Sequence, residues 1–89
     1  MIKKTVTIVN NLGLHARPSA MLVSASSKFS SEVFFTKDSL RVNGKSIMGV
    51  MMLAAEKGSK LVVETDGSDE SEAMEQIIKV IESGFDEMG

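Results

Sequence analysis

The chain has 89 residues, 43% of them hydrophobic and 25% charged, so a single globular domain over residues 1–89 is expected. A formal net charge of −2 gives no basis for binding nucleic acid, and the lack of cysteine excludes disulfides and thiolate metal sites. The longest apolar stretch, residues 47–55, is far shorter than a membrane span, and the first residues do not resemble a signal peptide, so a cytoplasmic protein without membrane insertion is expected.

The first predicted elements are a strand and a helix. Residues 2–9 are rich in β-branched side chains and alternate with period two, which is typical of a strand. A helix is expected to begin at Ala16, because Pro18 is tolerated in a first turn whose backbone N–H groups lack partners. One face of the strand would carry Ile2, Lys4, Val6 and Ile8, and the apolar side of the helix would comprise Ala16, Ala20, Met21, Leu22, Ala25 and Phe29.

A β-hairpin and a short helix follow. Two strands with a turn near Lys37 and Asp38 are predicted on a β-prone background. In the first strand Val33 and Phe35 alternate with Phe34, and the second strand is carried by Leu40 and Val42. Residues 46–57 predict a helix that stops at Gly58, since glycine is common just past helix C-termini. Within this helix, the core is expected to receive Val50, Met52 and Leu53.

The last predicted elements are a strand over residues 60–65 and a strongly amphipathic helix. Ser68 or Asp69 is suited to cap this helix, and Gly84 lies near its end. The order β-α-β-β-α-β-α favours an α+β, two-layer open-faced sandwich, with three helices on one face of a mostly antiparallel four-stranded sheet. The apolar stripe of the last helix comprises Met74, Ile77, Ile78, Ile81 and Phe85.

The only histidine and the only proline lie in the stretch NNLGLHARPSA, where the predicted strand gives way to the first helix. His15 immediately precedes that helix, whose unpaired N–H groups and partial positive charge suit an anion such as phosphate. A neutral imidazole can act as a nucleophile, and Arg17 adds a fixed, planar positive charge suited to phosphoryl oxygens. From composition alone, the more ordinary interpretation is that His15 is a helix-boundary residue and Arg17 a solvated charge.

The octapeptide GLHARPSA, residues 13–20, closely resembles the active-site motif of HPr, the histidine-containing phosphocarrier family of the bacterial phosphoenolpyruvate-dependent sugar phosphotransferase system. A second motif, GKSIMGVMMLA at residues 44–54, extends the resemblance, as do the length and element order of the whole chain. The resemblance implies strand order 1-4-2-3 in the sheet. It also implies that His15 accepts a phosphoryl group through Nδ1, with Arg17 as the neighbouring active-site residue.

The function that this resemblance implies is that of a stoichiometric phosphoryl carrier rather than an independent enzyme. The carrier would receive phosphoryl from phosphorylated enzyme I, with phosphoenolpyruvate as the ultimate donor, and pass it to enzyme IIA of sugar permeases. It would be a monomer that needs no cofactor and no metal ion. Leu12 stands where some family members carry a polar residue, which bears on the choice of partner.

Two features of the second predicted helix carry further expectations. Ser46 is suited to cap it, and by resemblance Ser46 also matches the regulatory site of HPr kinase/phosphorylase in bacteria that have this enzyme; both interpretations can hold together. The helix is also too short to bury all its apolar side chains, and methionine suits surfaces that fit several partners. We therefore expect a partly exposed docking patch beside His15, formed by Ala20, Ile47, Met48 and Met51.

Two alternatives stay open at this point. A carrier in a regulatory, nitrogen-type phosphorelay would have the same histidine motif as a carrier for sugar uptake. A small βαββαβ module that binds a ligand or RNA fits the element order, but RNA binding by base stacking needs exposed aromatic and basic side chains. The chain has four phenylalanines as its only aromatic residues and a negative net charge, which disfavours RNA.

Overall fold

The computed structural model describes residues 1–87 and contains one antiparallel sheet in the order β1-β4-β2-β3. This confirms the strand order implied by the resemblance. β4 lies in the middle of the sheet, with β1 and β2 on its two sides. The strands are β1 (Ile2–Thr7), β2 (Glu32–Lys37), β3 (Leu40–Asn43) and β4 (Lys60–Asp66).

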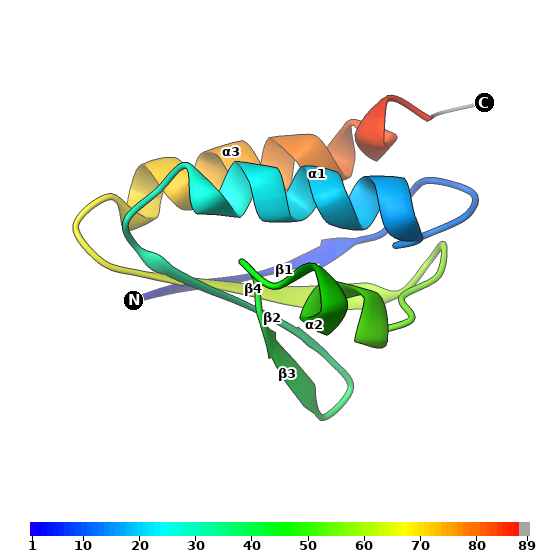
Figure 1. Ribbon diagram of the computed structural model, residues 1–89, viewed down its shortest axis with the longest axis horizontal. Coiled ribbons are helices and arrows are strands. Elements are labelled where there is room, and N and C mark those ends of the chain that lie inside the picture. The colour runs from blue at the N-terminus through cyan, green and yellow to red at the C-terminus, as the bar shows by residue number, and fades with distance from the viewer. Residues whose placement is uncertain (88–89) are drawn as a thin grey trace.

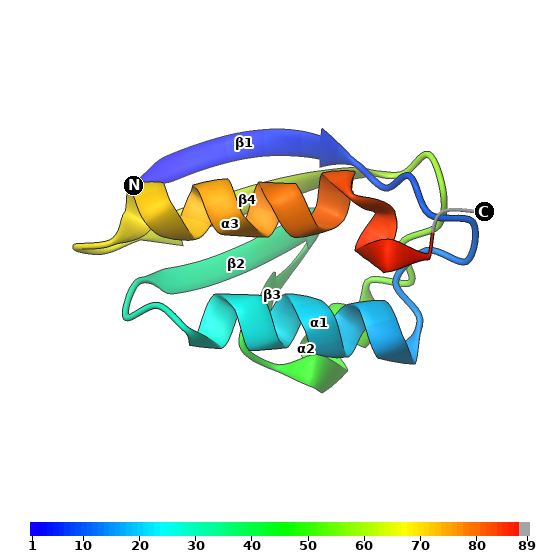
Figure 2. The ribbon, with the colours of Figure 1, turned by 90° about the horizontal axis from the view of Figure 1, so that it is seen from above.

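Helices form the second layer, as the element order predicts. α1 and α3 lie side by side across one face of the sheet, and α2 packs beside α1 and β3 (Figures 1 and 2). The start of α1 and the C-terminal segment lie at the same end of the molecule, far from the N-terminus (Figure 1). The helices are α1 (Ala16–Ser27), α2 (Ile47–Met52) and α3 (Glu70–Glu82), followed by a single 3-10 turn, η1 (Gly84–Asp86).

The core lies between the sheet and the two long helices. The strand alternation holds, because Val33 and Phe35 of β2 are buried while Phe34 is only half-buried. Most of the predicted stripe of α3 is confirmed, because Met74, Ile77 and Ile81 are buried, together with Ala73, and Ile78 packs against them. Phe85 is also buried, but it lies in η1, beyond the end of α3. Each fully buried aliphatic side chain stabilises the fold by roughly 1.5–3 kcal/mol, so α3 is held to the sheet by this stripe.

The buried side of α1 differs from the prediction. Ala16 and Ala20 are exposed, whereas Ser19 and Ser26 are fully buried. Each buried serine hydroxyl donates to a backbone carbonyl, at 3.1 and 2.8 Å respectively, so neither is left unpaired in the core. Phe29 lies beyond the end of the helix and is half-buried.

The second helix is shorter than the sequence predicts. α2 ends at Met52, well before Gly58, because Ala54 takes a left-handed backbone conformation with φ 49°. The chain leaves the helical path there and buries both Leu53 and Ala55. Met52, predicted to lie in the core, is 66% exposed instead.

Candidate functional site

His15 is the N-cap residue of α1. Its backbone is extended (φ −80°, ψ −171°), and its carbonyl accepts a hydrogen bond from the N–H of Ser19 at 3.0 Å. The imidazole makes no capping bond, and 37% of the side chain is exposed. The first turn of α1 contains no acidic residue, so the positive end of the helix is not neutralised by its own side chains.

The loop that carries His15 is fastened to the segment after α2. The N–H of Leu14 donates to the carbonyl of Ala55 at 2.9 Å. Gly13 has a left-handed backbone (φ 66°), and a Cβ at this position would overlap the same carbonyl oxygen. Glycine is therefore required here both by the turn and by the close approach of the two backbones.

A carboxylate from the C-terminal segment, 72 residues away in sequence, reaches the imidazole. The Glu87 oxygens Oε1 and Oε2 lie 3.1 and 3.0 Å from Nε2 of His15. The hydrogen bond from His15 lowers the pKa of the Glu87 carboxyl below its ordinary value; a hydrogen bond from Asn10 and the charge of Arg17 act in the same direction, and burial opposes them. Glu87 is therefore ionised at neutral pH, and the site contains a carboxylate–imidazole pair.

A buried amide holds the inner side of this carboxylate. Asn10 is fully buried, and its Nδ2 donates to Oε1 of Glu87 at 3.0 Å and to the carbonyl of Gly13 at 2.9 Å. If the amide were turned over, its oxygen would face two acceptor oxygens and could bond to neither. The two partners therefore identify the atom that faces them as nitrogen. The amide oxygen of Asn10 has no hydrogen-bond partner among the described residues.

An unusual turn brings Glu87 to the site. Gly84, Phe85 and Asp86 all have positive φ angles of 73°, 57° and 59°, and the N–H of Glu87 donates to the carbonyl of Gly84 at 2.9 Å. A left-handed backbone costs a residue other than glycine about 1–3 kcal/mol. Phe85 is fully buried, which stabilises the turn by about 1.5–3 kcal/mol, so packing holds the segment in this conformation.

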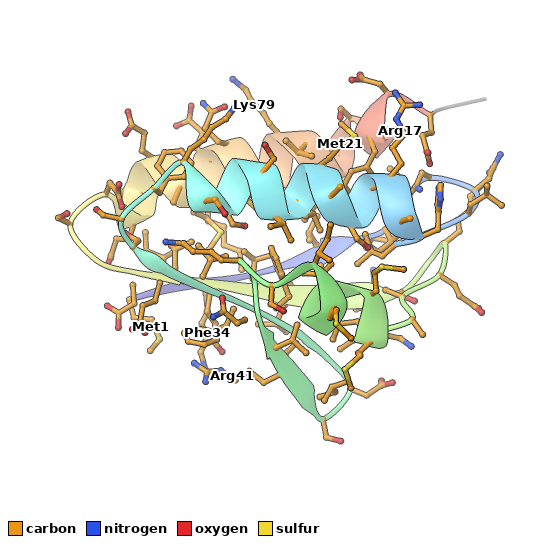
Figure 3. All side chains as sticks on the ribbon, in the orientation of Figure 1. Met1, Arg17, Met21, Phe34, Arg41 and Lys79 are labelled. Atoms are coloured by element: carbon orange, nitrogen blue, oxygen red, sulfur yellow. The ribbon has the colours of Figure 1, made fainter. Side chains whose placement is uncertain are left out.

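Arg17 lies in the first turn of α1 and is exposed. Figure 3 shows its side chain rising from the start of α1 alongside the C-terminal segment. It borders an open cleft together with Asn11, Leu12, Asp86 and Glu87. The site thus combines a nucleophilic ring, the positive end of a helix and a guanidinium, which together suit a phosphoryl group.

The other residues singled out from the sequence lie on α1 and α2, which pack against each other. Ser46 is the N-cap of α2, and its hydroxyl oxygen accepts a hydrogen bond from the N–H of Gly49 at 3.1 Å, which confirms the predicted cap. Met48 is 72% exposed, and the remaining members of the predicted patch are also exposed: Ala20, Ile47 and Met51.

Sequence reasoning missed Asn10 and Glu87. Asn10 continues the buried alternation of Val6 and Ile8, which was a signal for a buried polar side chain. Nothing local to Glu87 indicated its contact with His15. Within residues 1–87, no group of three or more His, Asp or Glu side chains is placed to hold a metal ion, and no helix there is long and apolar enough to cross a membrane.

Comparisons with known proteins give a consistent result. Residues 2–83 match the family PTS-HPr, described as the PTS HPr component phosphorylation site. "Phosphocarrier protein HPr" of Neisseria meningitidis serogroup A is 53% identical over 87 residues, which cover 98% of each chain. The crystal structure of HPr-C-His from Thermoanaerobacter tengcongensis superimposes with a TM-score of 0.96 at 44% identity over the full length of both chains. An HPr dimer from the same organism matches with a TM-score of 0.77 at 45% identity, covering 96% of this chain and 98% of that chain.

Proposed function

Because the chain belongs to the HPr family of phosphocarriers of the phosphotransferase system, we propose that it accepts a phosphoryl group on His15 from phosphorylated enzyme I. It then passes this group to enzyme IIA of sugar permeases, in the cytoplasm. The observation that carries the proposal is the partly exposed imidazole of His15 at the N-cap of α1, with Arg17 in the following turn. The protein acts as a stoichiometric carrier rather than as an enzyme with its own turnover.

The geometry of His15 and Arg17 supports the following transfer step. Nδ1 of His15 attacks the phosphorus atom, an N–P bond forms, and the bond between phosphorus and the donor breaks, leaving its electron pair on the donor. The negative charge on the phosphoryl oxygens is stabilised by the first N–H groups of α1 and by the guanidinium of Arg17. Delivery to enzyme IIA is the same displacement with the carrier as leaving group.

The partners dock on the exposed apolar side chains that lie on α1 and α2. Methionine side chains adapt to differently shaped surfaces, which suits a protein that must bind both a donor and a recipient. This docking patch consists of Ala20, Ile47, Met48 and Met51.

Ser46 adds a proposed point of regulation. A kinase of the HPr kinase/phosphorylase type would place a phosphate of about −1.5 to −2 charges on its hydroxyl, at the N-terminus of α2 and next to Ile47 of the docking patch. The added charge would hinder docking electrostatically, while the cap itself is preserved by the phosphate oxygens.

The decisive experiment is incubation with enzyme I and phosphoenolpyruvate, followed by intact-mass measurement. We expect one added phosphoryl group, labile in acid and stable in base as a phosphoramidate is, and no addition to His15→Ala. The fold of His15→Ala should be intact because the side chain is partly exposed. Phosphorylation that persists in His15→Ala would exclude His15 as the acceptor.

Two further measurements define the partners. Offering the phosphorylated carrier to enzyme IIA of a sugar permease and to a nitrogen-type IIA protein distinguishes transport from a regulatory phosphorelay; we expect faster transfer to the sugar component.

Size-exclusion chromatography with light scattering should give the mass of a monomer, 9.6 kDa.

A further inference from the structure

We propose that Glu87 is a positioning residue for phosphoryl transfer: its carboxylate holds the proton of His15 on Nε2, so that Nδ1 presents its lone pair, and it stabilises the charge that the ring gains on phosphorylation. This inference rests on the proposed role of His15 as acceptor. Its basis is the pair of contacts of 3.1 and 3.0 Å between the Glu87 carboxylate and Nε2.

The chemistry of the two groups fixes the position of the proton. An ionised carboxylate only accepts hydrogen bonds, so Nε2 of His15 must be the donor in this pair. In a neutral imidazole one nitrogen carries hydrogen and the other carries the lone pair. Glu87 therefore selects the tautomer in which Nδ1 is the nucleophile.

The carboxylate of Glu87 is itself held in place by the side chain of Asn10. The buried amide of Asn10 donates one N–H to Glu87 and the other to the carbonyl of Gly13, two residues before His15. The same amide thus fixes both the carboxylate and the loop that carries the imidazole. The left-handed turn of η1, which is held by the buried side chain of Phe85, places Glu87 beside His15.

The imidazole ring gains a positive charge during transfer, and the carboxylate of Glu87 lies next to it. When Nδ1 bonds to phosphorus and the donor departs with its electron pair, Nε2 keeps its hydrogen and the ring becomes positively charged. No proton needs to move. The adjacent carboxylate stabilises this cationic ring, as the buried aspartate does for histidine in serine proteases, and on delivery the N–P bond breaks and the ring returns to neutral.

The test compares Glu87→Ala and Glu87→Gln with a matched control, Glu82→Ala. Glu82 is an exposed carboxylate in the last turn of α3, so this variant also removes one negative charge from the C-terminal part of the chain. Two quantities are measured: the nitrogen and Nε2–H proton resonances of the unphosphorylated imidazole, and the rate of phosphorylation by enzyme I.

We expect a protected, hydrogen-bonded Nε2–H resonance in the wild-type protein and in Glu82→Ala. In Glu87→Ala the resonance should be lost to exchange with water, and the transfer rate should fall by about tenfold or more. Glu87→Gln keeps an acceptor but loses the charge, so it should retain the resonance in part while its rate still falls. Glu82→Ala should transfer within about twofold of the wild-type rate.

Three results would overturn the inference. The first is a wild-type transfer rate in Glu87→Ala, and the second is an equal loss of rate in Glu82→Ala, which would indicate a general charge effect. The third is a slow Glu87→Ala variant whose imidazole resonances match those of the wild-type protein, because Glu87 would then act on docking. If enzyme I does not phosphorylate the wild-type protein, the proposed function fails, whereas the imidazole spectrum still decides whether Glu87 holds Nε2.

Discussion

The carboxylate of Asp69 is bound to Ser31 across the molecule rather than to the helix that it precedes. Asp69 is the N-cap residue of α3 but makes no capping bond with its side chain. Its Oδ1 accepts from both the N–H and the hydroxyl of Ser31, and its Oδ2 accepts from the N–H of Ser30 at 3.0 Å. This cluster joins the segment after α1 to the start of α3, so it ties the two long helices together.

We expect Asp69→Asn to lower stability in a pH-dependent way. The hydroxyl of Ser31, followed by the N–H groups of Ser30 and Ser31, lowers the pKa of Asp69 from 3.8 to about 2. Since the folded pKa is below the unfolded one, the stabilisation is fully present above about pH 4 and is lost as the pH falls through 2. Denaturant unfolding of the two proteins from pH 7 to 2 measures this. Glu72→Gln, a charge loss in the first turn of the same helix, is the control, and a deficit that is unchanged at pH 2 would contradict the assignment.

Replacement of Arg17 should slow transfer without unfolding the protein. We expect the rate of phosphorylation by enzyme I to fall by roughly tenfold to a hundredfold in Arg17→Ala, and by less in Arg17→Lys, since lysine offers a point charge without the planar fork. Arg41→Ala is the matched control, because Arg41 lies over the ring of Phe34 on the sheet face that α1 and α3 leave uncovered (Figure 3). Wild-type rates in both Arg17 variants would show that this residue is only a solvated charge.

A charged residue in the docking patch should weaken binding of enzyme I. Met48→Glu and Met51→Glu should each raise the dissociation constant by about tenfold, while the free energy of unfolding changes by no more than about 0.5 kcal/mol. Leu40→Glu places the same charge on an exposed apolar residue of β3 and serves as the control. A large loss of thermal stability in either methionine variant would place that side chain in the core.

Ser46 variants separate capping from regulation. Ser46→Ala loses the hydrogen bond to Gly49 and should be destabilised by about 1 kcal/mol, whereas Ser46→Asp retains an acceptor and should stay level or gain about 0.3–1 kcal/mol. Ser46→Asp should nevertheless be phosphorylated more slowly on His15 at low salt, and added salt should partly restore the rate by screening. Equal rates for the two variants at low salt would mean that Ser46 is only a cap.

The parts of the fold that sequence predicted well are those with a strong local signal. The stripe of α3 identifies its buried face because large apolar side chains recur at the period of the helix. In β2 the apolar side chains are consecutive, and Val33 and Phe35 share the buried face while Phe34 lies on the other. In α1 the signal is weak, since alanine and serine are both small. Which of Ala20 or Ser19 faces the core is decided by tertiary packing and by whether a carbonyl is available to the hydroxyl.

The segment after α2 shows a different limit. The sequence continues with helix-compatible residues to Gly58, and nothing in it signals the left-handed conformation of Ala54. That conformation follows from long-range contacts, because it buries Leu53 and Ala55 and presents the carbonyl of Ala55 to the loop of His15. The contact of Glu87 with His15 has the same character: it depends on a turn whose geometry is set by packing across the molecule.

The placement of one imidazole at one end of a small domain has a kinetic consequence. Under the proposed function, donor and recipient could not both reach His15 at once, so they would compete for the carrier, and no complex of all three proteins would contribute to transfer. Throughput then depends on how quickly each complex separates. With association rate constants of about 10⁶–10⁷ M⁻¹s⁻¹, release within roughly 10 ms demands dissociation constants no tighter than about 10–100 μM. A small docking patch with two flexible methionines would suit this demand, because a tighter interface would slow the release of each partner.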